Sequence, residues 1–162
     1  MPLVLLRIDD RLLHGQVLVG WGGALDVSWY VIADDEIAAS EWERDLYAAG
    51  LPAGVEGAFL TVDEAARAIE SLEAREGAGV LLTRAPGAMR RIAETGALRG
   101  RDVNLGGLHA APGRRRAADY VYLSGPDIEE LEAIERAGAS VTARDLPGAR
   151  RVPLAELVRA AR

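Results

Sequence analysis

Cysteine and lysine are both absent from this sequence of 162 residues, and each absence excludes a class of site. Without cysteine the chain has no disulfides and no thiolate metal sites. Without lysine it has no Walker phosphate-binding loop, and all 19 basic residues are arginine. The two histidines lack metal-ligand spacing, no G-x-G-x-x-G follows the first apolar run, and no serine lies in a G-x-S-x-G elbow. We therefore expect no bound metal and no cofactor.

Long apolar runs are also missing. The opening run, Leu3 to Leu6, is too short for a signal peptide or a membrane-spanning helix, so we expect a cytoplasmic location. The net charge of −6 argues against broad binding to nucleic acid. The length suits one domain with a substantial core, and we expect a single α/β domain over residues 1–162.

Short β-rich runs alternate with helical patterns along the chain. Strands are predicted at Val4–Ile8, Trp29–Ala33, Val55–Leu60, Val80–Thr83, Val103–Leu105, Tyr120–Leu123 and Ser140–Ala143. Helices are predicted after Gly15, over Asp35–Ala49, from a Thr61–Glu64 capping box to Glu76, from Pro86 to Thr95, over Pro126–Ala137 and over Leu154–Ala161. Such alternation predicts a doubly wound, mostly parallel sheet with helices on both faces.

Three details of this pattern are more specific. The helix over 35–49 has a candidate buried stripe, formed by Ile37, Trp42, Leu46 and Tyr47. A cluster of glycines, Gly20, Gly22 and Gly23, is expected to end the first helix. The arginine run Arg114–Arg116 lies between two strands that no helix connects, and we interpret it as a solvated loop.

Open parallel sheets place their ligand sites at the carboxyl ends of the strands. The rule selects residues that follow four predicted strands, all expected at one edge: Asp9, Asp10, Arg11, His14, Gly15, Asp34, Asp35, Arg84, Gly106, Gly107 and His109.

His14 is the candidate nucleophile of this group, because it lies in a strand-to-helix loop among arginines and aspartates. A neutral imidazole can attack phosphorus, an aspartate can orient one of its ring nitrogens, and Arg11 can stabilise the transferring charge. A plainer interpretation is equally open: Asp9 and Asp10 form a salt-bridged turn with Arg7 and Arg11, and His14 is an ordinary loop residue.

Three segments resemble one known family. The segment Arg7-Ile8-Asp9-Asp10-Arg11-Leu12-Leu13-His14-Gly15-Gln16-Val17 resembles the phosphorylation loop of enzyme IIB in the mannose/fructose/sorbose family of the sugar phosphotransferase system. Val31-Ile32-Ala33-Asp34-Asp35-Glu36-Ile37-Ala38 resembles the family's second strand and turn, and Asn104-Leu105-Gly106-Gly107-Leu108 resembles its N-[VIL]-G-G segment. The segments also follow one another in the family's order.

The resemblance implies a phosphocarrier with a doubly wound α/β fold. A IIA partner would phosphorylate His14, on Nδ1, and the group would pass to a sugar held by the membrane components IIC and IID, which would make the protein peripheral to the membrane. Arg11 would hold the phosphoryl group, and Gly15, Gln16, Gly106 and Gly107 would surround it. We favour Asp10 over Asp9 for orienting the loop.

Several other residues are given weaker expectations. Asp9, Asp34, Asp35, Arg84 and His109 are expected in a second layer around the site, and His109 is interpreted as a loop residue. Arg114–Arg116 is a candidate docking contact for an acidic rim of IIA.

Two other functions use the same loop. A regulatory phosphoprotein would keep the phosphorylation of His14 without sugar transport, and an anion-binding domain would bind phosphate without transfer. The sugar and the oligomeric state are not encoded in any motif of this chain.

Overall fold

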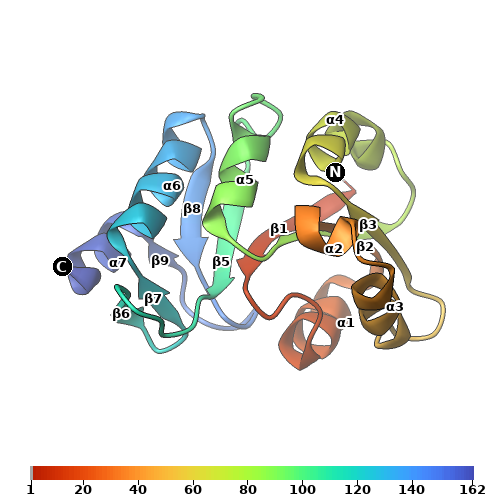
Figure 1. The fold of residues 1–162 in the computed structure, drawn as a ribbon, viewed down its shortest axis with the longest axis horizontal. Coiled ribbons are helices and arrows are strands. Elements are labelled where there is room, and N and C mark those ends of the chain that lie inside the picture. Colours follow the sequence, from red (N-terminus) through yellow and green to blue (C-terminus); the bar gives the residue numbers. More distant parts are fainter. Residues whose placement is uncertain (1) are drawn as a thin grey trace.

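A seven-stranded sheet forms the centre of the fold in the computed structural model, which describes residues 2–162 (Figure 1). In spatial order its strands are β3 (Glu56–Leu60), β2 (Val27–Ala33), β4 (Ala78–Thr83), β1 (Leu3–Asp9), β5 (Asp102–Gly107), β8 (Ser140–Ala143) and β9 (Val152–Pro153). Every neighbouring pair is parallel except β8 and β9. A separate antiparallel pair consists of β6 (Arg115–Ala118) and β7 (Val121–Leu123).

Helices cover both faces of this sheet, so the predicted fold class is confirmed (Figure 1). One face carries α4 (Val62–Glu73), α5 (Pro86–Ala93), α6 (Gly125–Arg136) and α7 (Leu154–Ala161). The other carries the π-helix η1 (Gln16–Trp21), α1 (Gly22–Leu25), α2 (Asp35–Ala38) and α3 (Glu41–Ala49). Within the described residues, no helix has the length and apolar character needed to cross a membrane.

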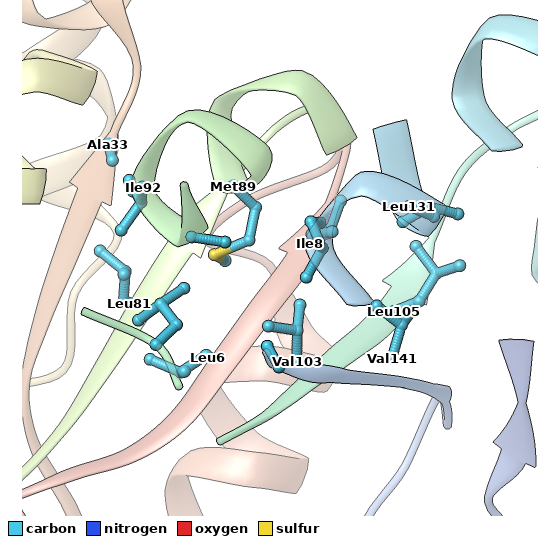
Figure 2. Close-up of a cluster of buried hydrophobic side chains, with 14 of the residues drawn as sticks. Leu6, Ile8, Ala33, Leu81, Met89, Ile92, Val103, Leu105, Leu131 and Val141 are labelled. Atoms are coloured by element: carbon cyan, nitrogen blue, oxygen red, sulfur yellow. The ribbon is translucent and has the colours of Figure 1, made fainter. Parts of the chain in front are cut away.

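The central strands are apolar on both faces, as a sheet buried on both sides requires. Along β1, Leu6 and Ile8 face one layer of helices, whereas Leu5 packs in the opposite layer. Figure 2 shows the first layer, where Met89 of α5 and Leu131 of α6 lie with side chains of β1, β4 and β5. This packing fixes β1 in the middle of the sheet.

Local signals set the helix ends that the sequence predicts. Thr61 and Glu64 form the expected capping box of α4, and Ser124 caps α6 in the same way with Asp127. The capping box predicted at Thr61 is confirmed.

The first helical segment differs from the prediction. A six-residue π-helix follows Gly15, and Gly22 and Gly23 lie inside the short α1 that continues it. A side chain at Gly22 would collide with the Tyr30 hydroxyl, 2.7 Å from the position of a Cβ. Gly22 therefore allows close packing of this helix against Tyr30, and the helix ends instead at Asp26, in the left-handed conformation.

The single helix predicted over 35–49 is also wrong. The chain forms α2 and α3, and the break lies at Ser40, which caps α3. Two residues of the predicted stripe are exposed, Trp42 at 72% and Leu46 at 57%, whereas Ile37 is buried and Tyr47 is partly buried against the same cluster.

Two strands were not predicted. The arginine run is not a loop as predicted, because Arg115 and Arg116 belong to β6. The strand β9 has only two residues, too few to show an apolar pattern in the sequence.

We predict that Gly79→Ala destabilises the sheet. Gly79 pairs with Trp29 of the neighbouring strand, and an added Cβ would lie 2.2 Å from the indole ring. Overpacking of this kind lowers the free energy of unfolding by about 1–3 kcal/mol, measurable by urea denaturation.

Gly23→Ala is the matched control, because no heavy atom lies within 4 Å of its added Cβ. This variant is expected to gain roughly 0.5–1 kcal/mol from helix propensity. Equal stability of the two variants would refute the packing argument.

Candidate active site

The carboxyl ends of β2, β4, β1 and β5 lie next to one another because these strands are adjacent and parallel. His14 follows β1, at the centre of that edge. The backbone N–H of Asp10 donates to the Gly107 carbonyl at 3.0 Å, which joins the loop after β1 to the end of β5. The structure therefore gathers the predicted strand-end residues along one edge of the sheet.

Asp9 is the centre of the site, and its carboxylate is fully buried. Its Oδ2 atom accepts hydrogen bonds from Arg7 Nη2 at 2.9 Å and lies 3.0 Å from Nε2 of His14. Its Oδ1 atom accepts from the backbone N–H and Nε of Arg11, at 3.1 and 3.2 Å. One carboxylate thus contacts both arginines and the candidate nucleophile.

The Asp9 carboxylate remains ionised in this setting. Burial raises its pKa, but the hydrogen bond with His14, the charge of Arg7 and the hydrogen bonds from Arg11 outweigh burial and lower the pKa to about 2. An ionised carboxylate only accepts hydrogen bonds. The nitrogen that faces it, Nε2 of His14, therefore carries a proton, and in the neutral form of the ring the lone pair is on Nδ1.

A strained turn brings His14 back over Asp9. Leu12 has φ of 54°, uncommon for a residue other than glycine, and its N–H donates to the Asp9 carbonyl at 3.0 Å. The Leu12 side chain is fully buried on the face of the sheet that η1, α1, α2 and α3 cover. Burial of this leucine stabilises the unusual turn.

Arg11 lies beside this pair and is only partly covered, with 33% of its side chain exposed. Its Nη2 donates to Oε1 of Gln16 at 2.9 Å. A Cβ at Gly107 would lie 3.2 Å from the same Nη2, so the glycine leaves room for the guanidinium. Arg11, Gln16 and Gly107 are therefore brought together as predicted.

Arg7 is a member of the site that the sequence analysis named only in the plainer, salt-bridged interpretation. Its guanidinium is fully buried and also donates to Oδ1 of Asn104 at 2.6 Å. A Cβ at Gly106 would lie 2.0 Å from the Arg7 guanidinium carbon. Gly106 thus makes room for the Arg7 guanidinium. The sequence signal that could have identified Arg7 is the presence of a charged residue within the apolar run of a central strand.

Asp10 does not contact the His14 ring; it binds His109. Its Oδ2 accepts from the His109 N–H at 2.8 Å, and its Oδ1 lies 2.7 Å from His109 Nδ1. Arg114 donates to the His109 carbonyl and to Asp127, both at 2.9 Å. Asp10 therefore joins the loop after β1 to the loop after β5, whereas Asp9 is the carboxylate that contacts the His14 ring.

The second strand end forms its own cluster. Asp34 caps α2 and lies 3.5 Å from Nε of Arg84. Asp35 accepts hydrogen bonds from the Val62 N–H and from Arg91, both at 2.9 Å. These contacts connect α2 to β4, α4 and α5, and they place Asp34, Asp35 and Arg84 in a structural cluster rather than around Asp9.

A cleft of about 200 Å³ opens beside Arg11. It is lined by Arg11, Gln16, Gly107, Leu108, His109, Asp119, Tyr120 and Tyr122. The sequence analysis missed the last three residues, because they come from the segment around β7, which lies outside the main sheet.

We predict that Asp9→Asn lowers the free energy of unfolding at pH 7 by roughly 3 kcal/mol, because it leaves the Arg7 charge buried without its partner. The pKa of Asp9 is depressed, so its stabilising effect is present above about pH 4 and is lost as the pH falls toward 2. In urea denaturation, the difference in the free energy of unfolding between parent and variant should become smaller as the pH is lowered over that range.

Asp119→Asn is the control, because it alters an exposed carboxylate paired with Arg116. Its effect should stay within about 0.5 kcal/mol. A difference between Asp9→Asn and parent that is independent of pH would contradict the ionised state of Asp9.

The chain matches one protein family and several known proteins. The family model of the PTS system sorbose subfamily IIB component matches residues 3–162. The N-acetylgalactosamine-specific phosphotransferase enzyme IIB component 1 of Escherichia coli K12 is 30% identical, with 90% of this chain and 92% of that protein covered.

Two further matches extend this finding. The mannose-specific EIIAB component of the same organism is 27% identical, with 98% of this chain covered and 49% of that protein. The crystal structure of the IIBSor domain of the sorbose permease from Klebsiella pneumoniae superposes with a TM-score of 0.86 at 23% identity, covering 98% and 97% of the two chains, and thus shares the fold. The chain belongs to the sorbose subfamily of IIB components of the phosphotransferase system.

Proposed function

We propose that residues 1–162 act as one IIB unit in which His14 accepts a phosphoryl group from a IIA partner and passes it to a sugar. IIB components are transferases of the phosphotransferase system, and the family assignment is consistent with phosphotransfer in sugar uptake. The observation that carries the proposal is the contact between His14 Nε2 and the buried, ionised Asp9. A histidine held in this way presents its other nitrogen as the nucleophile.

The proposed transfer uses Nδ1 of His14. Nδ1 forms a bond to phosphorus as the nitrogen–phosphorus bond of the donor histidine breaks, and the proton on Nε2 stays in place. The ring becomes positively charged, and the Asp9 carboxylate 3.0 Å away stabilises that charge. In the release step the Nδ1–phosphorus bond breaks as a sugar hydroxyl oxygen bonds phosphorus, the ring returns to its neutral form, and the hydroxyl proton passes to a base on the acceptor or to water.

Arg11 is the proposed ligand of the transferring group. Its guanidinium is partly exposed and bonds a neutral amide oxygen, that of Gln16, besides Asp9. An incoming phosphoryl group offers charged oxygens, with which arginine forms stronger, two-pronged hydrogen bonds. Gly15 and Gln16 follow His14 directly, and Gly107 adjoins Arg11, so these three residues complete the proposed phosphate surroundings.

The proposed partners follow from the family. The mannose-specific relative is named an EIIAB component, which joins A and B in one protein, and this chain covers 49% of it. A IIA unit is thus the proposed donor, and the membrane pair IIC and IID, which would hold the sugar, is the proposed acceptor. The protein would then act in the cytoplasm, at the membrane surface. Of the arginine run, Arg115 and Arg116 remain candidates for docking IIA because both are exposed, although Arg116 also pairs with the exposed Asp119, whereas Arg114 is largely covered and binds Asp127.

We predict that His14 becomes phosphorylated and that His14→Ala does not. The protein is incubated with phosphoenolpyruvate, the upstream carriers and IIA, and is then analysed by mass spectrometry at alkaline pH, which preserves phosphohistidine. His109→Ala is the control and should still accept one phosphoryl group.

Phosphate on another residue would refute the proposed mechanism. Phosphorylation of His14 with no transfer to sugar in vesicles that contain IIC and IID would favour the regulatory function. Reversible phosphate binding without a covalent product would favour the anion-binding domain.

We also predict that Arg11→Lys slows phosphoryl transfer by about 100- to 1,000-fold, as the loss of one group that stabilises transition-state charge does. An ammonium group keeps the charge but not the fork of donors. Single-turnover quench-flow with phosphorylated IIA measures the rate.

Arg91→Lys is the matched control, because Arg91 is similarly exposed, at 37%, and pairs with Asp35 and Asp63 away from His14. A rate in Arg11→Lys equal to that of the control would exclude the proposed role of Arg11.

A further inference from the structure

Arg7 is, like Asp9, a fully buried charged group of the site, and the transfer step proposed above does not use it directly. Its side chain is fully buried, a position that arginine almost never takes unless it is paired. Its Nε and Nη2 atoms donate to Oδ2 of Asp9 at 3.3 and 2.9 Å. This two-point contact fixes the direction of the carboxylate as well as its charge.

Three other segments hold the guanidinium in turn. Nη1 donates to Oδ1 of Asn104 in β5 and to the Arg144 carbonyl, at 2.6 and 3.0 Å. Nη2 donates to the Asp145 carbonyl at 3.2 Å, and the guanidinium lies 5.3 Å from the ring of Trp21 in η1. Arg7 is thus fixed more firmly than a single ion pair requires.

We propose that Arg7 is a positioning residue for phosphoryl transfer: it holds the Asp9 carboxylate so that His14 keeps its proton on Nε2 and its lone pair on Nδ1. The inference rests on the proposed function of His14. It extends the proposed site beyond the residues that contact the phosphoryl group, because a buried arginine acts on the nucleophile through one carboxylate oxygen.

The shared oxygen is the key to this inference. Oδ2 of Asp9 contacts Arg7 at 2.9 Å and His14 at 3.0 Å, whereas Arg11 binds Oδ1 at 3.2 Å and reaches Oδ2 only at 3.4 Å. Without the contacts from Arg7, the carboxylate can rotate toward Arg11 and leave the His14 ring without a fixed partner. Both ring nitrogens are then able to carry the proton, and a fraction of the molecules has no lone pair on Nδ1.

The bonds and charges that change during phosphoryl transfer show where Arg7 acts. The nitrogen–phosphorus bond forms at Nδ1 while the donor bond breaks, and no proton leaves Nε2. The positive charge that develops on the ring is stabilised by Asp9, whose own position depends on Arg7. Arg7 therefore touches neither phosphorus nor the ring, and its effect passes through Asp9.

Arg7→Lys is the test variant, because it keeps the positive charge and loses the two-point contact. The first measurement is ¹⁵N NMR of the His14 ring in the unphosphorylated protein, which reports which nitrogen carries the proton. We expect Nε2–H in the parent and a mixture of tautomers in the variant. The second measurement is single-turnover transfer from phosphorylated IIA, expected to slow by roughly 10- to 100-fold, as losses of outer partners do at metal sites.

Arg101→Lys is the matched control for a merely structural effect. Arg101 is also mostly buried and pairs with Glu73 at 2.6 Å, at the opposite end of β5. This variant should lose stability and yet keep the parent's tautomer and transfer rate. Asn104→Ala loosens Arg7 without removing it, and it should shift both measurements in the same direction by a smaller factor.

The outcomes are separable. A folded Arg7→Lys with Nε2–H on His14 and the parent's transfer rate would overturn the inference. If Arg7→Lys does not fold, Asn104→Ala decides, and unchanged values in that variant would overturn it equally. The NMR measurement needs no phosphorylation, so a parent that never accepts phosphate would refute the proposed function while the tautomer result still reports on Arg7.

Discussion

The buried ion pair between Arg7 and Asp9 is the constraint on which the rest of the site depends. Removing two charges from water costs several kcal/mol for each ion, and attraction repays that cost only where other hydrogen bonds satisfy the remaining donors and acceptors. Here Asn104, two backbone carbonyls, Arg11 and His14 supply those bonds. The candidate nucleophile is thus itself one of the groups that stabilise the buried charge.

Strand geometry explains how so many groups meet at one carboxylate. Residues two apart on a strand face the same side, so Arg7 and Asp9 both point to the same side of β1. Arg7 pairs in register with Asn104 of β5, and Gly106 lies two residues further on the same side. The polar asparagine and the missing side chain of Gly106 are therefore adaptations of β5 to the arginine of β1.

This geometry also shows which features could be predicted from the sequence. The alternation of strand and helix patterns predicts a parallel sheet and the edge of the sheet at which the site lies. The position of His14 in the loop after the first strand identifies it as the candidate nucleophile. The choice between Asp9 and Asp10 cannot be predicted, because adjacent residues face opposite sides and the sequence does not show which side the loop returns to. Leu12 decides this by turning left-handed into the core. The sequence does not predict the break at Ser40, because apolar residues continue at helical spacing on both sides of it. Trp42, just after the break, is exposed.

The charges of the site favour reversible transfer in the proposed cycle. With His14 neutral, Arg7 and Arg11 outnumber Asp9 by one positive charge, which attracts an anionic phosphoryl group. After transfer the ring gains one positive charge and the phosphoryl group brings about two negative charges, so the charges cancel. The neighbouring carboxylate of Asp10 lies outside this group, because it faces His109 and Arg114.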